Sequence, residues 1–223
     1  MKKKYDFLLS NIIPVGVITW AFLYYRILFV NNRLISLDDL SGNILGIIIQ
    51  HIIVNFPIWI LLVVSLKAIE RKKLCLSMPD KKRWKILLLL LIFVYIGLFF
   101  YGLDISENEI KTLYIFLFYF LFVSFPEEYL YRGFIPVLQK NKLPKIMEWI
   151  LPNILFSASH YVMLFVDGAG IRGISLSELI AFFITTVIFG VVMELLKRKS
   201  NSLYIAVLCH AIYDFYGEIM LWL

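Results

Sequence analysis

Long apolar segments separated by short polar loops make up most of this chain. A bilayer core of roughly 30 Å requires about 20 apolar residues in a helix, and about seven segments approach or exceed that length. The pattern predicts an all-α fold: a polytopic transmembrane helical bundle of about seven spans, or eight if the helix after Pro126 is a separate element. We expect the spans at Phe7–Val30, Leu40–Ile69, Trp84–Tyr101, Thr112–Phe125, Glu148–Val166, Leu176–Leu196 and Ser202–Trp222.

The first two spans each contain an internal proline. Pro14 lies in the first span, where we expect a kink, and Pro57 lies in the second, which is long enough to tilt or break. The first span follows three consecutive lysines, as in a signal peptide, but no small-residue cleavage site follows its long apolar stretch. We therefore expect it to remain as an uncleaved span.

The composition excludes an ordinary soluble domain. Of the 223 residues, 61% are hydrophobic and 17% are aromatic. We expect one packed bundle, a single integral-membrane domain over residues 1–223. The two cysteines, Cys75 and Cys209, cannot supply a disulfide framework and are interpreted as small buried residues.

Most basic residues lie in the loops, and their distribution predicts the orientation of the chain. With the N-terminus in the cytoplasm, 18 of the 22 lysines and arginines fall on the inner side. This asymmetry is the one that the positive-inside rule describes. The net charge of +6 is therefore explained by basic loops at the membrane surface rather than by nucleic-acid binding. The pattern predicts a multi-pass protein of the cell membrane. The remaining four residues are Arg26, Arg33, Lys111 and Arg172.

One apolar segment ends in a stretch of ionisable side chains, PEEYLYR, at residues 126–132. Ionisable groups at membrane depth are costly and usually mark pathways or reaction sites. Glu128 and Arg132 are four residues apart and can pair on one helix face, whereas Glu127 points about 100° away, toward the bundle interior. We expect the helix to continue through this stretch; a break at Pro126 would instead leave free amide groups beside the carboxylates. Alternatively, the two glutamates mark only the membrane boundary.

Histidines recur inside two later apolar segments. His160 follows a run of small residues, and His210 lies four residues before Asp214, so that both side chains project from one helix face. At a rise of 1.5 Å per residue, Glu127, His160 and His210 all reach the middle-to-cytoplasmic half of the membrane. The alternative for each histidine is a structural hydrogen bond. His51 has no ionisable neighbour in the sequence, and we assign it only that structural role.

These motifs, in this order on successive predicted spans, resemble the CPBP family. The family comprises CAAX-prenyl endopeptidases and bacteriocin-processing or self-immunity proteins, also called the Abi family, and the resemblance covers a catalytic core of about residues 112–220. It implies an intramembrane endopeptidase whose cavity opens toward the cytoplasm. The motifs are Glu127-Glu128-x-x-x-Arg132, Phe156-x-x-x-His160 and His210-x-x-x-Asp214.

The resemblance also implies a role for each residue. Glu127 with His160 would activate a water molecule for attack on a peptide carbonyl, and His210 with the residue at 214 would stabilise the oxyanion. Glu128, Arg132 and Phe156 would support the site. The family often has Asn at the last position, and an ionised Asp214 cannot donate a hydrogen bond.

The sequence is compatible with a mechanism that needs no cofactor and with one that needs zinc. Members of the family have been described both as glutamic proteases and as metalloproteases, and we favour the mechanism without a cofactor. In the alternative, Glu127, His160 and His210 bind zinc, since two imidazoles and a carboxylate leave one position for water. No H-E-x-x-H motif supports that alternative.

The leading hypothesis is therefore proteolysis of a peptide or protein substrate at the membrane. By resemblance to bacterial members, the favoured role is processing of, or self-immunity to, a peptide toxin (bacteriocin), with CAAX-type tail processing as a further option. The alternative is a non-enzymatic immunity protein that binds the toxin within the bilayer and tolerates Glu127→Gln. An ion-coupled transporter ranks last, because the outer half of the membrane has no convincing ionisable groups.

Overall fold

The computed structural model describes residues 2–30, 44–69, 73–77, 113–166 and 175–220, and the single residues 85, 89 and 92. The predicted third span, Trp84–Tyr101, lies outside the described residues apart from those three positions. The predicted loops at 31–39, 102–111 and 167–173 also lie outside them.

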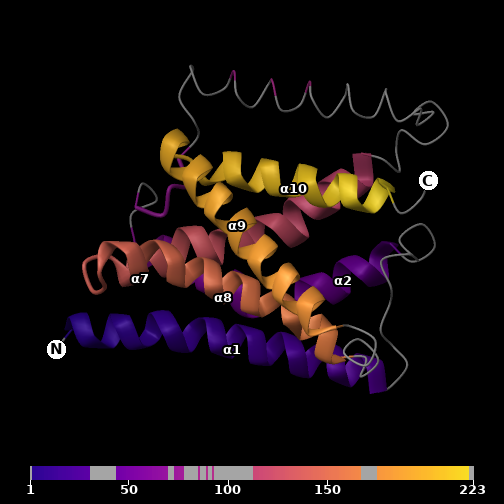
Figure 1. Cartoon of the computed structure of the whole chain (residues 1–223), viewed down its shortest axis with the longest axis horizontal. Coiled ribbons are helices and arrows are strands. Elements are labelled where there is room, and N and C mark those ends of the chain that lie inside the picture. The colour runs from indigo at the N-terminus through magenta and orange to yellow at the C-terminus, as the bar shows by residue number, and fades with distance from the viewer. Residues whose placement is uncertain are drawn as a thin grey trace.

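Every regular element within the described ranges is helical, as Figure 1 shows, so the predicted all-α class is confirmed. A continuous helix, Leu113–Gln139, is called the central helix here. It includes the π-helical turns η2 (Tyr119–Ser124) and η3 (Tyr129–Phe134) and the α-helical pieces α6 (Phe125–Glu128) and α7 (Ile135–Gln139). The other helices are α1 (Lys2–Val30), α2 (Ile44–Val54), α3 (Phe56–Ala68), α8 (Lys145–Val166), α9 (Leu176–Ser200) and α10 (Leu203–Met220).

Two of the described helices are long and apolar enough to cross a membrane, the central helix and α9. The pair α2 and α3 would add a third as a span bent by 59°. The bend lies at Asn55, with Pro57 in the first turn of α3; of the two possibilities expected for the second span, a tilt or a break, the structure shows the break. The total of about seven spans stays a prediction.

The surface of α9 shows why a membrane environment suits this fold. Exposed apolar side chains recur along it at four-residue intervals, which places them on one face of a helix. This face gains stability only against an apolar medium such as lipid. Its first members are Leu176, Ile180, Ile184 and Ile188, of which Leu176 is 72% exposed.

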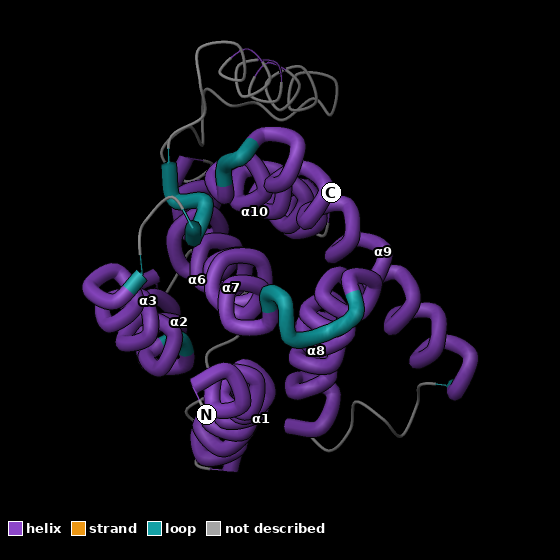
Figure 2. The backbone as a smooth tube through the Cα atoms, turned by 90° about the vertical axis from the view of Figure 1, so that its left-hand side faces the viewer, coloured by secondary structure: helices purple, strands orange, loops and turns teal. Residues whose placement is uncertain are grey.

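The central helix is enclosed by its neighbours. In Figure 2, α7 lies in the middle of a ring that contains α1, α2, α3, α8 and α10. The contacts agree: α1 packs on α7, α3 on η3, and α10 on η2 and α6. The ionisable residues of the central helix are therefore carried into the interior of the bundle.

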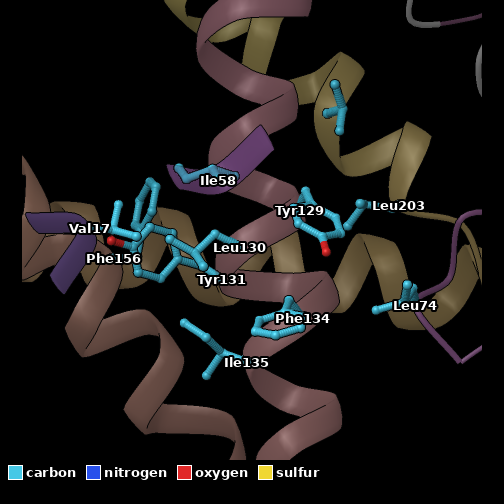
Figure 3. Close-up of a cluster of buried hydrophobic side chains, with 11 residues drawn as sticks. Val17, Ile58, Leu74, Tyr129, Leu130, Tyr131, Phe134, Ile135, Phe156 and Leu203 are labelled. Carbon is cyan, nitrogen blue, oxygen red and sulfur yellow. The ribbon is translucent and has the colours of Figure 1, made fainter. Parts of the chain in front are cut away.

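The apolar core surrounds η3. Tyr129, Leu130, Tyr131 and Ile135 are each at most 2% exposed, and Figure 3 shows them on the central helix between side chains from other segments. The hydroxyl group of Tyr129 is hydrogen-bonded to Ser65 and donates to the carbonyl of Leu61 at 3.2 Å. Because buried polar groups need partners, these bonds fix α3 against the central helix.

Candidate active site

Two π-helical turns flank the α-helical segment Phe125–Glu128. Each turn closes with an amide bonding five residues back, from Phe125 to Phe120 and from Ile135 to Leu130. π-turns inside helices are rare and occur frequently at functional sites. The helix continues through Pro126, as expected for this stretch, and the break with free amide groups does not occur. Widened turns accommodate the proline instead.

Prolines also explain two side-chain contacts to the backbone of the central helix. Pro126 and Pro136 have no N–H to donate to the carbonyls four residues earlier, those of Phe122 and Arg132. Asn55 Nδ2 donates to Phe122 O at 2.8 Å, and Lys197 Nζ donates to Arg132 O at 2.8 Å. Donors from the α2–α3 bend and from α9 thus satisfy carbonyls on both sides of the glutamate pair.

Glu128 lies at the centre of a buried ionic network. Its Oε1 atom is 3.3 Å from Arg132 Nη1 and accepts a hydrogen bond from His210 Nδ1 at 2.9 Å. Glu128 is fully buried, and the side chains of Arg132 and His210 are at most 3% exposed. The predicted pairing of Glu128 with Arg132 is confirmed. The contact with His210 joins this pair to a helix 82 positions later in the sequence.

Arg132 is held on its other sides by α8 and α9. Its guanidinium carbon lies 3.9 Å from the centre of the Phe156 ring, and its Nη2 donates to Asn153 Oδ1 at 3.4 Å. Gly190 makes room for this contact, since a Cβ there would lie 2.6 Å from both Arg132 Nη2 and Asn153 Oδ1. Phe156 therefore supports the site through a cation–π contact.

His210 presents its second ring nitrogen to two further carboxylates. Its Nε2 is 3.3 Å from Asp214 Oδ2 and 3.8 Å from Glu127 Oε2. Rings of Phe189 and Phe156 meet the imidazole edge to face, at centroid distances of 4.9 and 5.9 Å. This packing and the bond to Glu128 fix the direction of Nε2.

His160 approaches Glu127 from α8. Its Nδ1 lies 2.9 Å from the carbonyl oxygen of Phe156, which can only accept, so we assign the hydrogen to Nδ1. Nε2 is then the atom that faces Glu127 Oε2, at 3.9 Å. Both side chains are about one quarter exposed and line a cavity of about 190 Å³. Among the described residues, Glu127 Oε2 has no direct hydrogen-bond partner.

The structure thus brings together all of the residues singled out in the sequence. Glu127, His160, His210 and Asp214 meet at one point, while Glu128, Arg132 and Phe156 lie directly behind them. Sequence reasoning missed Asn55, His51, Asn153 and Lys197. His51 lines the same cavity as Glu127 and His160, which no sequence neighbour indicated. Amide side chains close to prolines in apolar segments were the available signal: Asn153 directly follows Pro152, and Asn55 lies two residues before Pro57.

The residues of the alternative zinc set are too far apart for a tetrahedral site. Two ligands bound about 2.0–2.1 Å from one zinc ion are roughly 3.3 Å apart. Glu127 Oε2 instead lies 3.9 and 3.8 Å from the two imidazole nitrogens. Within the described ranges, no three His, Cys, Asp or Glu side chains form a metal-binding group. In this arrangement the donors do not fit a zinc ion.

Fold and site together define a helical membrane protein with an acid–imidazole centre inside its bundle. Residues 109–216 match the model of a protease family, described as type II CAAX prenyl endopeptidase Rce1-like. The predicted resemblance to the CPBP family is confirmed over this region, which contains all seven predicted site residues. No curated protein and no solved structure gave a match. The family match supports an intramembrane endopeptidase, which acts on a peptide or protein at the membrane.

Proposed function

We propose that this protein hydrolyses a peptide bond within the membrane by a metal-free mechanism in which Glu127 is the general base. One observation carries the proposal. Glu127 Oε2 lies 3.9 Å from His160 Nε2 and 3.8 Å from His210 Nε2, at the wall of a partly open cavity. These separations exceed a direct hydrogen bond and suit polar groups bridged by one water molecule.

Glu127 and His160 activate that water. The water hydrogens point to Glu127 Oε2 and to the lone pair of His160 Nε2, so that its oxygen faces the substrate. As the oxygen bonds to the peptide carbonyl carbon, Glu127 takes one proton. When the C–N bond breaks, Glu127 returns that proton to the leaving nitrogen, and the products are a carboxylic acid and an amine.

His210 stabilises the tetrahedral oxyanion. Its Nδ1 donates to Glu128, and its Nε2 faces two carboxylates, so we infer a doubly protonated imidazolium that donates from both nitrogens. A donor aimed at the developing negative charge lowers the barrier, by about 3–4 kcal/mol in well-studied cases. Asp214 orients Nε2 as an acceptor, and Glu128 is a positioning residue for the ring.

The favoured biological role remains the one implied by the CPBP resemblance. We propose a bacterial, multi-pass protein of the cell membrane with a cytoplasmic N-terminus, whose substrate is a peptide toxin to be processed or neutralised. A prenylated tail is the second substrate class. The excess of positive charge on the predicted inner side and the apolar face of α9 support this location.

A cleavage assay with matched variants tests the mechanism. Purified protein, Glu127→Gln and His160→Ala are incubated with an apolar membrane peptide, a toxin leader peptide and a prenylated tail peptide. We expect cleavage by the wild type, and a loss of about 10²–10⁴-fold in both variants. A chelator should leave the wild-type rate unchanged.

Other outcomes select the alternatives. Loss of activity on chelation, with recovery on adding zinc, would replace the metal-free mechanism by a zinc mechanism despite the wide spacing. Failure of the wild type to cleave, combined with toxin protection that survives Glu127→Gln, would favour the non-enzymatic immunity protein. Equal cleavage by the wild type and both variants would show that Glu127 and His160 do not take part in catalysis.

A further inference from the structure

The cavity beside Glu127 is formed largely by helices outside the family match. Residues 109–216 supply Glu127 and His160, whereas α1 and the α2–α3 bend supply much of the remaining lining. From α1 come Val17, Ile18, Ala21 and Tyr25. The reacting groups thus come from the matched region, whereas more than half of the residues around the cavity come from α1 and the α2–α3 bend.

The lining from α1 and α3 is mainly apolar. Val17 and Ile58 belong to the same buried cluster as Tyr131, and Figure 3 shows these labelled side chains on the part of the cluster that contains Phe156. Half of the lining residues carry a polar group, but the lining surface is mainly apolar, which favours a ligand with an apolar part. Glu127 and His160 can then interact with the peptide bond of the substrate, while the apolar walls contact a substrate side chain.

The cavity size sets the size of that ligand. An apolar protein cavity of about 150 Å³ holds a benzene molecule, and this cavity has about 190 Å³. One side chain of the size of Leu, Met or Phe fills such a space.

We propose that this cavity is a specificity subsite that receives one large apolar side chain of the substrate, from a residue adjacent to the cleaved bond. Ala21 of α1 sets its size limit, because it is the smallest side chain in the lining. This inference rests on the proposed peptidase activity and adds the substrate preference. It also assigns α1 a function in substrate selection.

A peptide library tests the subsite. The full-length protein in detergent is incubated with a mixture of membrane-soluble peptides randomised at internal positions, and the products are sequenced by mass spectrometry. We expect the wild type to select Leu, Met or Phe at one position flanking the cleaved bond. Ala21→Leu fills the cavity and should shift that position toward Ala and Gly by about tenfold or more in relative kcat/KM. The other positions should be unchanged.

Two further variants complete the design. Ile18→Ala enlarges the cavity and should shift the same position toward Trp, which keeps the proposal testable if Ala21→Leu does not fold. Leu23→Phe adds bulk at an exposed site of α1 and should leave the preference unchanged. Cleavage by the wild type with no side-chain preference, or with one that neither cavity variant changes, would overturn the subsite alone. Absence of any cleavage by the wild type would overturn the proposed activity itself, and the subsite with it.

Discussion

The Lys197 ammonium group donates a hydrogen bond to the carbonyl oxygen of Arg132 at 2.8 Å, inside the protein. This carbonyl lies four residues before Pro136, which has no N–H to donate to it. Lys197 is 6% exposed and is also paired with Glu194. A lysine that the sequence assigns to a cytoplasmic charge cluster is therefore part of the frame that holds the buried ionic network.

Replacing Lys197 should destabilise the bundle. Lys197→Met leaves the Arg132 carbonyl without this donor, and an unsatisfied buried polar group costs about 1–3 kcal/mol. Lys199→Met, at an exposed position of the same cluster, is the control and should have little effect on the free energy of unfolding. Unfolding by SDS titration in mixed micelles measures both. Equal effects for the two variants would show that the Lys197 bond contributes nothing.

Gly190→Ala should displace the Arg132 and Asn153 side chains and destabilise the protein. The added Cβ would lie 2.6 Å from Arg132 Nη2 and from Asn153 Oδ1, so these groups must move. We expect a loss of about 1–3 kcal/mol in unfolding free energy, as for other overpacked interiors. Gly217→Ala is the control, because a Cβ there meets nothing within 4 Å. In helical α10 that change should be neutral or stabilising by up to about 1 kcal/mol. The prediction fails if Gly190→Ala is as stable as the control.

Breaking the Glu128–Arg132 pair on one side should cost more than removing both charges. Glu128→Ala leaves a buried guanidinium without its carboxylate, a change that costs about 3–5 kcal/mol, whereas an apolar replacement of both partners is often tolerated. We therefore expect Glu128→Leu combined with Arg132→Met to be more stable than Glu128→Ala. Both should lose activity, because His210 Nδ1 then has no acceptor to fix its ring. A double variant less stable than the single one would contradict this account.

Asp214→Asn should retain activity. The asparagine oxygen can still accept from His210 Nε2, and the new NH₂ group can donate toward an oxyanion. We expect kcat within about tenfold of wild type. Asp214→Leu removes the acceptor and should lower kcat by about 10²-fold, within the range seen when an oxyanion donor is lost. Inactivation by Asn as complete as that by Leu would mean that the carboxylate itself takes part in proton transfer.

The sequence determined the class of the fold and the identity of the candidate chemistry. Apolar segments can satisfy their backbone groups in lipid only as helices or closed barrels, and their length here selects helices. Charged and imidazole side chains within such segments are too costly to occur without a role or a partner, so Glu127, Glu128, His160 and His210 stood out at once. The four-residue spacing also gave the Glu128–Arg132 and His210–Asp214 pairs.

Tertiary structure alone decided which groups meet. His210 bonds to Glu128 across 82 positions and Lys197 to Arg132 across 65, and no local spacing encodes such contacts. The π-turns were also hidden, because a proline in a helix is compatible with a break, a kink or a widened turn, and donors from other helices determine which is stable. His51 joined the cavity only when α2 packed beside the central helix. Periodicity fixes the face of a helix, whereas packing fixes what that face meets.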